Sequence, residues 1–239
     1  MKRIVYIFFI VFYLLLSILT LTHANKFAFV SDKDGYVNIR DQPSIKSNII
    51  STLKNREPVL CASTDDSPQF CFINFKNDGY GYVYKTRLDF FNKFQKINMI
   101  SYTPAKVTYK KENIKVEVFT NEIDRTVKLK NNKAVINDKE ILGTDGLIPT
   151  SDFIALNEII VNNNGKVLKI LRKDLEQFVF PRNGLGSAKN ELADFDIYAY
   201  GDRIYIMNVF NNGGAGEYSL VLIIENGMLR EKLFWRNTI

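Results

Sequence analysis

The chain reads DGYVNIRDQPS from Asp34 to Ser44. An Asp-Gly turn pair precedes a short strand candidate, and a Pro-Ser turn follows it. Five further strand candidates lie around this one between residues 26 and 84, with turn residues at close intervals. Six short strands in some sixty residues predict a small barrel, because little else buries that much strand edge in so short a chain. The six candidates are 26–30, 36–40, 49–53, 58–63, 70–76 and 80–84.

The second half has the pattern of a separate, mostly antiparallel β domain at 104–239, joined to the first by a linker at 89–103 that packs on one or both domains. Turn dipeptides such as Asn164-Gly165 and Asn226-Gly227 punctuate its strand candidates. One short helix is expected at 171–179, before Pro181. The predicted fold class is therefore mainly β, with a barrel at 25–88 and this second β domain. Its strand candidates are 105–109, 114–119, 126–130, 134–136, 158–161, 166–171, 195–200, 203–209, 218–225 and 229–235.

Residues 1–24 have the pattern of a targeting segment. Lys2 and Arg3 precede eighteen uncharged residues, from Ile4 to Leu21, and the small residue Ala24 follows. A basic start, an apolar stretch and a small residue at a plausible cleavage point are typical of a secretory signal peptide. The alternative is an uncleaved anchor, because the run approaches the ~20 residues that span a bilayer. In either case we expect the rest of the chain in the periplasm or cell envelope.

Composition excludes several classes of function. The single histidine of the sequence is His23, inside the targeting segment. A mature protein without histidine has no Ser-His-Asp or Cys-His catalysis and no ordinary zinc site, so we expect no metal and no cofactor. Removal of Lys2 and Arg3 leaves 30 basic residues against 26 acidic ones, a net charge of +4. This mild, dispersed charge does not suit a nucleic-acid binder. It would suit an anionic wall polymer or lipid surface, but an ordinary solvated surface of mixed charge explains it better.

Two cysteines remain in the mature chain, Cys61 and Cys71. They lie in two short apolar runs separated by a polar turn, and an even pair in an oxidising compartment favours a disulfide. A hairpin centred on Asp66 would place Cys61 opposite Cys71 and Val59 opposite Ile73, all on one face. The alternative, a catalytic thiol, needs an activating base that the mature sequence does not contain. We therefore predict a cross-strand disulfide.

The first half resembles a bacterial SH3-like domain. In that family a Gly-x-hydrophobic-Asn-hydrophobic-Arg strand runs into a Pro-Ser turn, a strand reading Ile-Gly-x-Leu follows, and Gly-Tyr-Val forms the last strand. The match covers about sixty residues in the family's order. This chain departs from the pattern at Phe70, where Trp is usual, and at Ser51, where Gly is usual. The matching segments are residues 34–44, Ile49-Ile50-Ser51-Thr52-Leu53-Lys54-Asn55 and Gly79-Tyr80-Gly81-Tyr82-Val83-Tyr84-Lys85-Thr86-Arg87-Leu88.

The resemblance implies binding rather than catalysis. Members of the family commonly accompany wall-active enzymes or envelope proteins and hold peptide or peptidoglycan stems, and no recognisable wall peptidase accompanies the module here. Tyr80, Tyr82 and Tyr84 alternate onto one face of the last strand, which makes them candidates for ligand contact. Arg40 and Phe70 complete the candidate set, although a groove that used the indole of a Trp would be altered by Phe70. Arg87, like Arg40, could pair with a carboxylate of the ligand. The alternatives are that the tyrosines only cover the barrel and that both arginines form salt bridges within it.

The second half resembles, over short segments, a group of uncharacterised exported proteobacterial proteins. Residues 213–216 have the pattern of a hairpin turn, because a phosphate-binding loop needs a helix behind it and a strand follows instead. Residues 143–146 have the pattern of a tight turn whose Asp bonds its own backbone, with Asp145 as an acid or ligand the alternative. Asp194 and Asp196 share a strand face and could bind a cation or serve in hydrolysis, but solvated carboxylates are far more frequent. No catalytic residue is assigned, because no base, nucleophile and orienting group can be assembled. The segments are Ile141-Leu142-Gly143-Thr144-Asp145-Gly146 with Pro149, and Asn212-Gly213-Gly214-Ala215-Gly216-Glu217-Tyr218.

The sequence thus favours an exported, non-enzymatic envelope protein whose SH3-like module binds a peptidoglycan peptide or a protein ligand. A cell-wall peptide or an envelope protein is the expected partner, nucleic acid is not, and membrane contact is expected only through an uncleaved N-terminal segment. The first alternative is a periplasmic inhibitor or immunity protein that docks onto a toxin or a wall hydrolase. The second is a carboxylate-based wall hydrolase built on Asp194 and Asp196.

Overall fold

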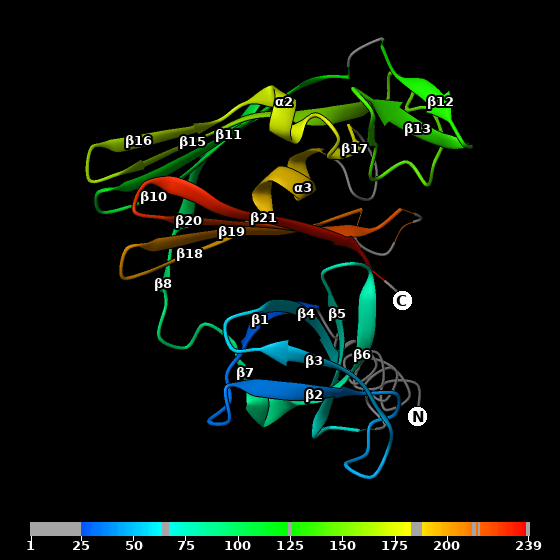
Figure 1. Ribbon diagram of the computed structural model, residues 1–239. Coiled ribbons are helices and arrows are strands. Elements are labelled where there is room, and N and C mark those ends of the chain that lie inside the picture. Colours follow the sequence, from blue (N-terminus) through cyan, green and yellow to red (C-terminus); the bar gives the residue numbers. More distant parts are fainter. Residues whose placement is uncertain are drawn as a thin grey trace, which may run out of the picture.

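The computed structural model describes residues 25–63, 67–123, 126–182, 188–211, 214 and 216–237. Antiparallel strands make up most of this part of the chain, and their sheets are stacked in layers (Figure 1). The predicted mainly β fold class is therefore confirmed, while the predicted targeting segment at 1–24 lies outside the described residues. No helix within the described ranges is long and apolar enough to cross a bilayer.

Seven strands form the N-terminal sheet, in the order β3-β2-β6-β5-β4-β1-β7. The first six match the ranges expected from the sequence to within one residue, because turn residues bound each of them. Inward side chains such as Ile39 and Ile73 form its core. Among the described pairings none joins β3 to β7, so the sheet curls without closing into a barrel (Figure 1). The elements are β1 (Lys26–Val30), β2 (Tyr36–Arg40), β3 (Ile49–Lys54), β4 (Pro58–Ser63), β5 (Phe70–Phe75), β6 (Gly79–Tyr84), η1 (Lys85–Arg87) and β7 (Leu88–Asp89).

Two further sheets pack face to face above the N-terminal sheet (Figure 1). The central sheet has the order β21-β20-β19-β18-β8, and the outer sheet has the order β16-β15-β11-β10-β9, with β17 also paired to β15. The predicted Asn-Gly turns join β15 to β16 and β20 to β21, and both residues of each turn have positive φ. The central strands are β8 (Gln95–Lys96), β18 (Asp196–Tyr200), β19 (Arg203–Phe210), β20 (Tyr218–Glu225) and β21 (Met228–Arg236). The outer strands are β9 (Asn98–Thr103), β10 (Lys106–Lys111), β11 (Ile114–Glu122), β15 (Phe153–Asn163), β16 (Lys166–Ile170) and β17 (Val179–Pro181).

A small three-stranded sheet and two short helices complete the described fold. The sheet consists of β12 (Lys128–Lys130), β13 (Lys133–Ile136) and β14 (Lys139–Glu140), and the helices are α2 (Arg172–Leu175) and α3 (Ala188–Ala193). The helix expected at 171–179 is therefore shorter than predicted, because α2 has only four residues. It ends early because Val179 and Phe180 pair with β15 opposite Ala155 and Ile154, as suits β-branched and aromatic residues. The sequence predicts one helix, and α3 is a second.

The central sheet is buried on both faces, which explains the apolar run of β20. Leu220 and Leu222 pack in the core shared with the outer sheet, whereas Val221 and Ile223 pack toward the N-terminal sheet. Glu225 at the end of the strand is its single residue that is not buried. A strand covered on both faces needs no alternation of polar and apolar residues, since successive side chains are all buried.

The N-terminal sheet contacts the central sheet through aromatic side chains. Phe27 and Phe29 of β1 face the central sheet, while Ala28 between them faces the core of its own sheet. The ring centroids of Phe29 and Tyr205 are 4.7 Å apart, and those of Phe27 and Trp235 are 6.5 Å apart. The layers are therefore joined by a continuous apolar cluster.

Residues 89–103, expected as a linker that packs on the domains, belong to the folded layers. Phe91 and Phe94 join the cluster between the N-terminal and central sheets. β8 then pairs with β18, Ile97 is fully buried, and β9 pairs with β10 in the outer sheet. The domain boundaries at 25–88 and 104–239 stay a prediction.

Cys61 and Cys71 form the predicted disulfide between β4 and β5, with Cα atoms 5.7 Å apart. The predicted register is wrong by two residues, because Ile73 lies opposite Cys61 rather than Val59, and Cys71 lies opposite Ser63. A shift of two residues keeps every side chain on its face, so the two sulfur atoms still meet diagonally across the ladder. Residues 64–66, on which the predicted hairpin was centred, lie outside the described residues.

Candidate functional site

The tyrosines of β6 point away from the core, as the alternation predicts. Gly81 and Val83 are buried, whereas Tyr80 is exposed and Tyr82 and Tyr84 are half-buried. This arrangement follows from the two-residue period of a strand. The tyrosines therefore share one face of β6, where they are available to a ligand.

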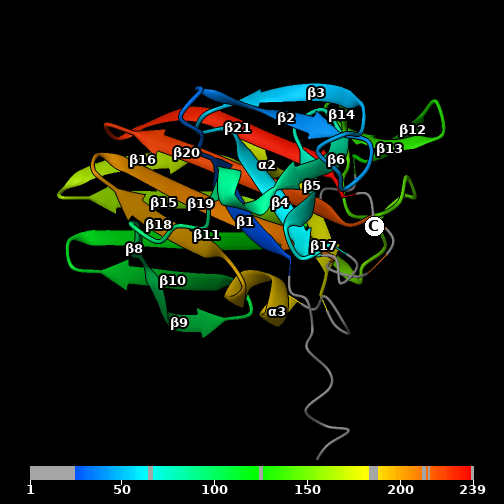
Figure 2. The same cartoon turned by 90° about the horizontal axis from the view of Figure 1, so that it is seen from below.

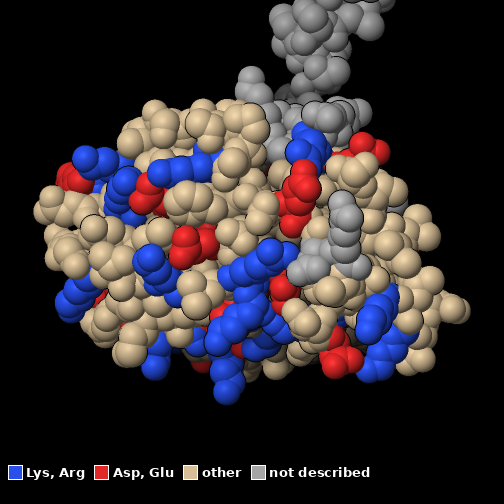
Figure 3. All heavy atoms as spheres, turned by 90° about the horizontal axis from the view of Figure 1, so that it is seen from above, with Lys and Arg blue, Asp and Glu red and all other residues tan. Residues whose placement is uncertain are grey.

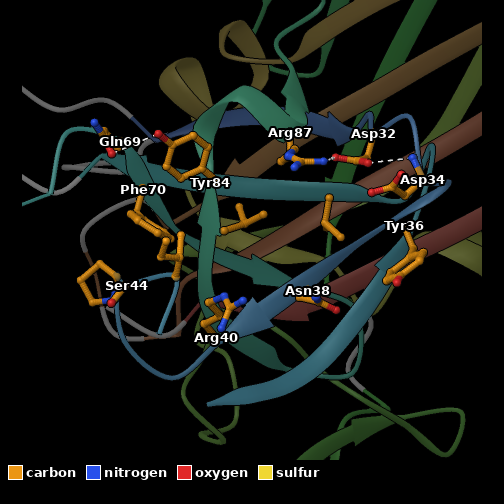
Figure 4. A pocket seen from close by; sticks show the side chains of 14 residues that line it. Asp32, Asp34, Tyr36, Asn38, Arg40, Ser44, Gln69, Phe70, Tyr84 and Arg87 are labelled. Atoms are coloured by element: carbon orange, nitrogen blue, oxygen red, sulfur yellow. Dashed lines mark hydrogen bonds and ion pairs between the residues drawn. The ribbon is translucent and has the colours of Figure 1, made fainter. Parts of the chain in front are cut away.

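A groove opens where β2 and β6 diverge (Figure 4). Within the described residues these strands pair only through Arg40 and Tyr82. Gly81 permits this close approach, since a Cβ atom there would lie 2.5 Å from Cγ2 of Ile39. On one side of the pairing lies a hollow of about 550 Å³, which we call the Arg40 groove. Its principal lining side chains are Tyr36, Arg40, Ile45, Phe70, Tyr84 and Arg87.

One end of the Arg40 groove is aromatic. Phe70 is buried, and its ring meets that of Tyr84 edge to face at a centroid distance of 5.1 Å. The Tyr84 hydroxyl donates to Oε1 of Gln69 at 3.0 Å. Figure 4 shows Gln69, Phe70 and Tyr84 together at this end. The two contacts hold the Tyr84 ring in place, so an apolar group bound here meets an ordered surface.

Arg40 supplies a positive charge to the same groove. Its Nη1 donates to the carbonyl oxygen of Ser47 at 2.6 Å, which ties the side chain to the 41–48 loop. In the part of the chain that the structure describes, no acidic side chain pairs with Arg40. A guanidinium carries five N–H donors in a fixed fork, so most of them remain for a ligand. The groove therefore offers donors suited to a carboxylate or a carbonyl group.

The opposite end holds an ion pair between Asp32 and Arg87 (Figure 4). The Asp32 carboxylate is almost inaccessible, and its Oδ1 accepts a hydrogen bond from the backbone N–H of Asp34 at 2.8 Å. Asn55 holds the backbone of Asp32 through two hydrogen bonds of 2.8 and 2.7 Å. Breaking the pair would leave a buried charge without a partner, so Arg87 is fixed in position. The pair at this end is therefore fixed, and the carboxylate of Asp34 beside it adds a further negative charge.

A second hollow, of about 840 Å³, lies on the other side of the pairing between Arg40 and Tyr82. We call it the Phe72 groove. The Phe72 ring lies 5.3 Å from that of Tyr82 and 6.0 Å from that of Tyr80, measured between centroids. Ile50 of β3 is half exposed at its edge. The surface is apolar and aromatic, and Lys76, Asp41 and Asp78 add charges at its border.

The structure divides the predicted candidates between the two grooves. Arg40, Phe70 and Tyr84 line the Arg40 groove, whereas Tyr80 and Tyr82 line the Phe72 groove. Sequence reasoning missed Tyr36, although alternation along β2 places it on the outward face together with Arg40. It also missed Asp32, for which the sequence has no signal, because its contact with Arg87 depends on how two distant loops fold.

Asp194 and Asp196 lie beside a third hollow, of about 360 Å³, which we call the Asp194 groove. Asp194 follows α3 and is exposed, and Asp196 is the first residue of β18. The Asp196 carboxylate is 3.1 Å from Nζ of Lys96. Burial, followed by the charge of Asp196, raises the pKa of Asp194. Asn25 and Phe27 border the groove from the start of the described chain.

The two glycine motifs of the second half pack against each other. A Cβ atom at Gly216 would lie 3.0 Å from the backbone nitrogen of Asp145. Asn211 joins the motifs, because its Nδ2 donates to the carbonyl oxygen of Gly143 at 2.8 Å and its backbone N–H donates to Oε1 of Glu191 at 2.9 Å. This close backbone packing gives the glycines a structural role. The motif residues Asn212, Gly213 and Ala215 lie outside the described residues.

Basic side chains gather over α2 (Figure 3). Lys139 donates to the carbonyl oxygen of Lys173, and Lys232 donates to that of Asp174 at 2.8 Å. Burial and, less strongly, the charge of Lys139 lower the pKa of Lys232, which the nearby Asp174 opposes. Cations that bond the last carbonyl groups of a helix stabilise it, so these lysines have a role in the fold.

No family model, curated protein or solved structure matches this chain. Among the described residues, no group of three or more His, Cys, Asp or Glu side chains is placed to hold a metal ion.

Proposed function

We propose that this protein is an exported, non-enzymatic binding protein of the cell envelope, and that its N-terminal SH3-like unit binds a peptide in the Arg40 groove. One observation carries the proposal: an open groove contains the free donors of Arg40 beside the ordered rings of Phe70 and Tyr84. A peptide offers the complementary groups, because its carboxylates and carbonyls accept hydrogen bonds from a guanidinium and its small side chains fill an apolar hollow.

The placement of the family motifs supports the SH3-like assignment. The segment that resembles Gly-x-hydrophobic-Asn-hydrophobic-Arg falls on β2, and the Gly-Tyr-Val segment falls on β6. These two strands border the Arg40 groove. The residues that carry the resemblance and those that line the groove therefore coincide.

Export is supported by two independent features. The disulfide between Cys61 and Cys71 belongs to an oxidising compartment, where such bonds persist. The basic and then apolar pattern of residues 1–24 is that of a secretory signal. We place the cleavage after Ala24, so that the mature protein begins at Asn25 and works in the periplasm.

A peptidoglycan stem peptide is the ligand class that we favour. Short peptides of this kind carry free carboxylates close to small side chains, which matches a guanidinium beside an aromatic surface. The rigid pair of Asp32 and Arg87 closes the other end of the groove and limits the length of peptide that can enter. The side chain of Tyr36, half exposed, lies beside Asp34 at the same end as this pair (Figure 4).

Retention on insoluble peptidoglycan tests the proposal. Purified mature protein is mixed with wall sacculi and sedimented, and the bound fraction is titrated to give an affinity. Arg40→Gln should weaken binding about tenfold or more, because a charge-assisted hydrogen bond contributes ~1.5–3 kcal/mol. Arg182→Gln is the matched control, since Arg182 pairs with Glu122 far from the groove. Wild-type protein that stays in the supernatant, or an Arg40→Gln variant that binds as wild type does, would contradict the proposal.

A protein ligand is the second candidate, as in an inhibitor or immunity protein, and the exposed isoleucines beside the grooves favour it. Ile45 exposes 69% of its surface, Ile49 52% and Ile50 50%. Clustered apolar exposure of this kind is typical of protein contact sites. Here a toxin or wall hydrolase would cover these residues. Ile49→Glu, at an exposed position that lines neither groove, would abolish recovery of that partner from envelope extract without changing retention on sacculi.

A hydrolase built on Asp194 and Asp196 is the function that we favour least. Asp196 is engaged by Lys96, which leaves one carboxylate rather than two for chemistry. Zymography on purified peptidoglycan should therefore show no clearing. A cleared zone that disappears in Asp194→Asn would replace the binding proposal by hydrolysis.

A further inference from the structure

The Asp194 groove adjoins the residue at which the proposed mature chain begins. Asn25 and Phe27 line it together with Asp194 and Asp196. In Figure 2 the start of β1 overlaps α3, the helix that leads directly into Asp194, while Figure 1 shows β1 below the central sheet and α3 above it. The first backbone atoms of the mature protein therefore border an acidic groove.

The charges around this groove leave one carboxylate without a cation. Lys96 is 3.1 Å from Asp196, whereas the side chain of Asp194 has no ion pair or hydrogen bond within the described ranges. Glu191, the next acidic neighbour, is buried and has a pKa raised to about 8, so it is mostly protonated at neutral pH. The hydroxyl of Tyr109 donates a hydrogen bond to the carbonyl oxygen of Leu192. Asp194 thus lines the groove without a cationic partner among the described residues.

We propose that the Asp194 groove is a binding site for an ammonium group, and that its occupant is the α-ammonium of Asn25 released by cleavage after Ala24. Hydrolysis adds one water across the bond between Ala24 and Asn25 and leaves a carboxylate on Ala24 and an ammonium on Asn25. Before cleavage the same nitrogen belongs to a neutral amide. The positive charge therefore arises only on processing, at a residue that lines the same groove as Asp194. This inference rests on the export and cleavage proposed above.

The ion pair would stabilise the mature form specifically. β1 starts at Lys26, and its Phe27 and Phe29 fill the cluster between the N-terminal and central sheets. An ion pair between Asn25 and Asp194 would fix the residue that precedes this strand. Fraying of the strand end is then reduced. The same pairing gives Asp194 a role that requires no catalysis.

A comparison of two N-termini tests the site. One protein begins at Asn25 after proteolytic removal of a fusion partner, and the other carries Gly-Gly-Ser before Asn25, which moves the ammonium away. We expect the first to melt about 2–4 °C higher, the shift that a single favourable contact produces in a protein of this length. In Asp194→Asn the two forms should melt together. Asp202→Asn, in the turn between β18 and β19, should keep the difference.

A titration of the α-amino group by NMR supplies a second readout. In the mature wild type its pKa should lie above the ordinary value of ~8, and it should fall in Asp194→Asn. Equal melting temperatures for the two wild-type forms, a difference that persists in Asp194→Asn, or an α-amino pKa unchanged by that substitution would each overturn the inference. N-terminal sequencing of protein taken from the envelope tests the cleavage separately, so a failed export proposal can be told from a failed ammonium site.

Discussion

Glu191 lies where a carboxylate is poorly stabilised. It is 3% exposed, and burial together with the charges of Asp194 and Glu217 raises its pKa from 4.5 to about 8, although a hydrogen bond from the Asn211 backbone works in the other direction. Between these two values the folded protein retains a proton that the unfolded chain has lost. Folding is then linked to proton binding, so the stability falls as the pH rises through this window.

Glu191→Gln should remove this pH dependence. The wild type should lose stability from pH 5 to pH 8, with a contribution from this group of at most about 1.4 kcal/mol per pH unit. The variant should vary less over the same range, because its amide does not titrate. Urea unfolding at four pH values measures the slopes, with Asp202→Asn as the control that should follow the wild type. Parallel slopes for wild type and Glu191→Gln would show that Glu191 is ionised in the folded protein.

At the scale of single elements, the strands of the N-terminal sheet were the most predictable part of the fold. Their ends depend on local turn residues, and their faces depend on a period of two, both of which the sequence displays. The register between β4 and β5 was not predictable in the same way. The position of Cys61 opposite Ile73 depends on the length of the turn, which local patterns leave open by two residues.

The helix expected at 171–179 shows how packing overrides a local pattern. Leu171, the first residue of the expected helix, is 47% exposed, and α2 ends at Leu175. Phe178 and Val179 are fully buried, with Val179 in a ladder position beside β15 rather than on a helix. Apolar residues at helical spacing therefore lie in a turn and a strand here, because periodicity over so few residues cannot distinguish a helix from a strand.

Gly81 sets the approach of β2 to β6, and its replacement tests how the Arg40 groove is formed. Gly81→Ala places a Cβ 2.5 Å from Cγ2 of Ile39 and 2.9 Å from the Arg40 carbonyl oxygen. Overpacking of this kind should lower the free energy of unfolding by about 1–3 kcal/mol. Gly201→Ala is the control, since Gly201 also has a positive φ but no neighbour within 4 Å. Equal losses in urea unfolding for the two variants would mean that backbone strain alone, not the approach of β2, explains the effect.

At the scale of the whole molecule, the layering could not be predicted from the sequence. The apolar run of β20 and the aromatic pair Phe27 and Phe29 are visible in the chain, but their partners are distant in it. The same limit applies to the candidate site. Alternation placed Tyr80, Tyr82 and Tyr84 on one face, whereas their division between two grooves follows from the divergence of β2 and β6.

Trp235 reports on the contact between the N-terminal and central sheets. It is the single tryptophan of the sequence, is 1% exposed and lies in the cluster that joins the two sheets. Urea unfolding followed by its fluorescence should therefore coincide with the loss of far-ultraviolet circular dichroism. Phe29→Ala should move both midpoints down together and lower the free energy of unfolding by about 3–5 kcal/mol. A fluorescence change that precedes the loss of circular dichroism would instead indicate that the N-terminal sheet detaches first.

The binding proposal for the whole molecule is tested most directly by two tyrosines of the same strand. Tyr82 and Tyr84 are both half-buried on the outer face of β6, but Tyr84 alone lines the Arg40 groove. After circular dichroism has confirmed folding, the affinity of each variant for sacculi is measured by sedimentation. Tyr84→Ala should weaken binding about thirtyfold, as loss of a central contact of ~2 kcal/mol implies, while Tyr82→Ala should bind nearly as wild type does. Full binding by Tyr84→Ala, or a loss confined to Tyr82→Ala, would contradict the assignment of the ligand to the Arg40 groove.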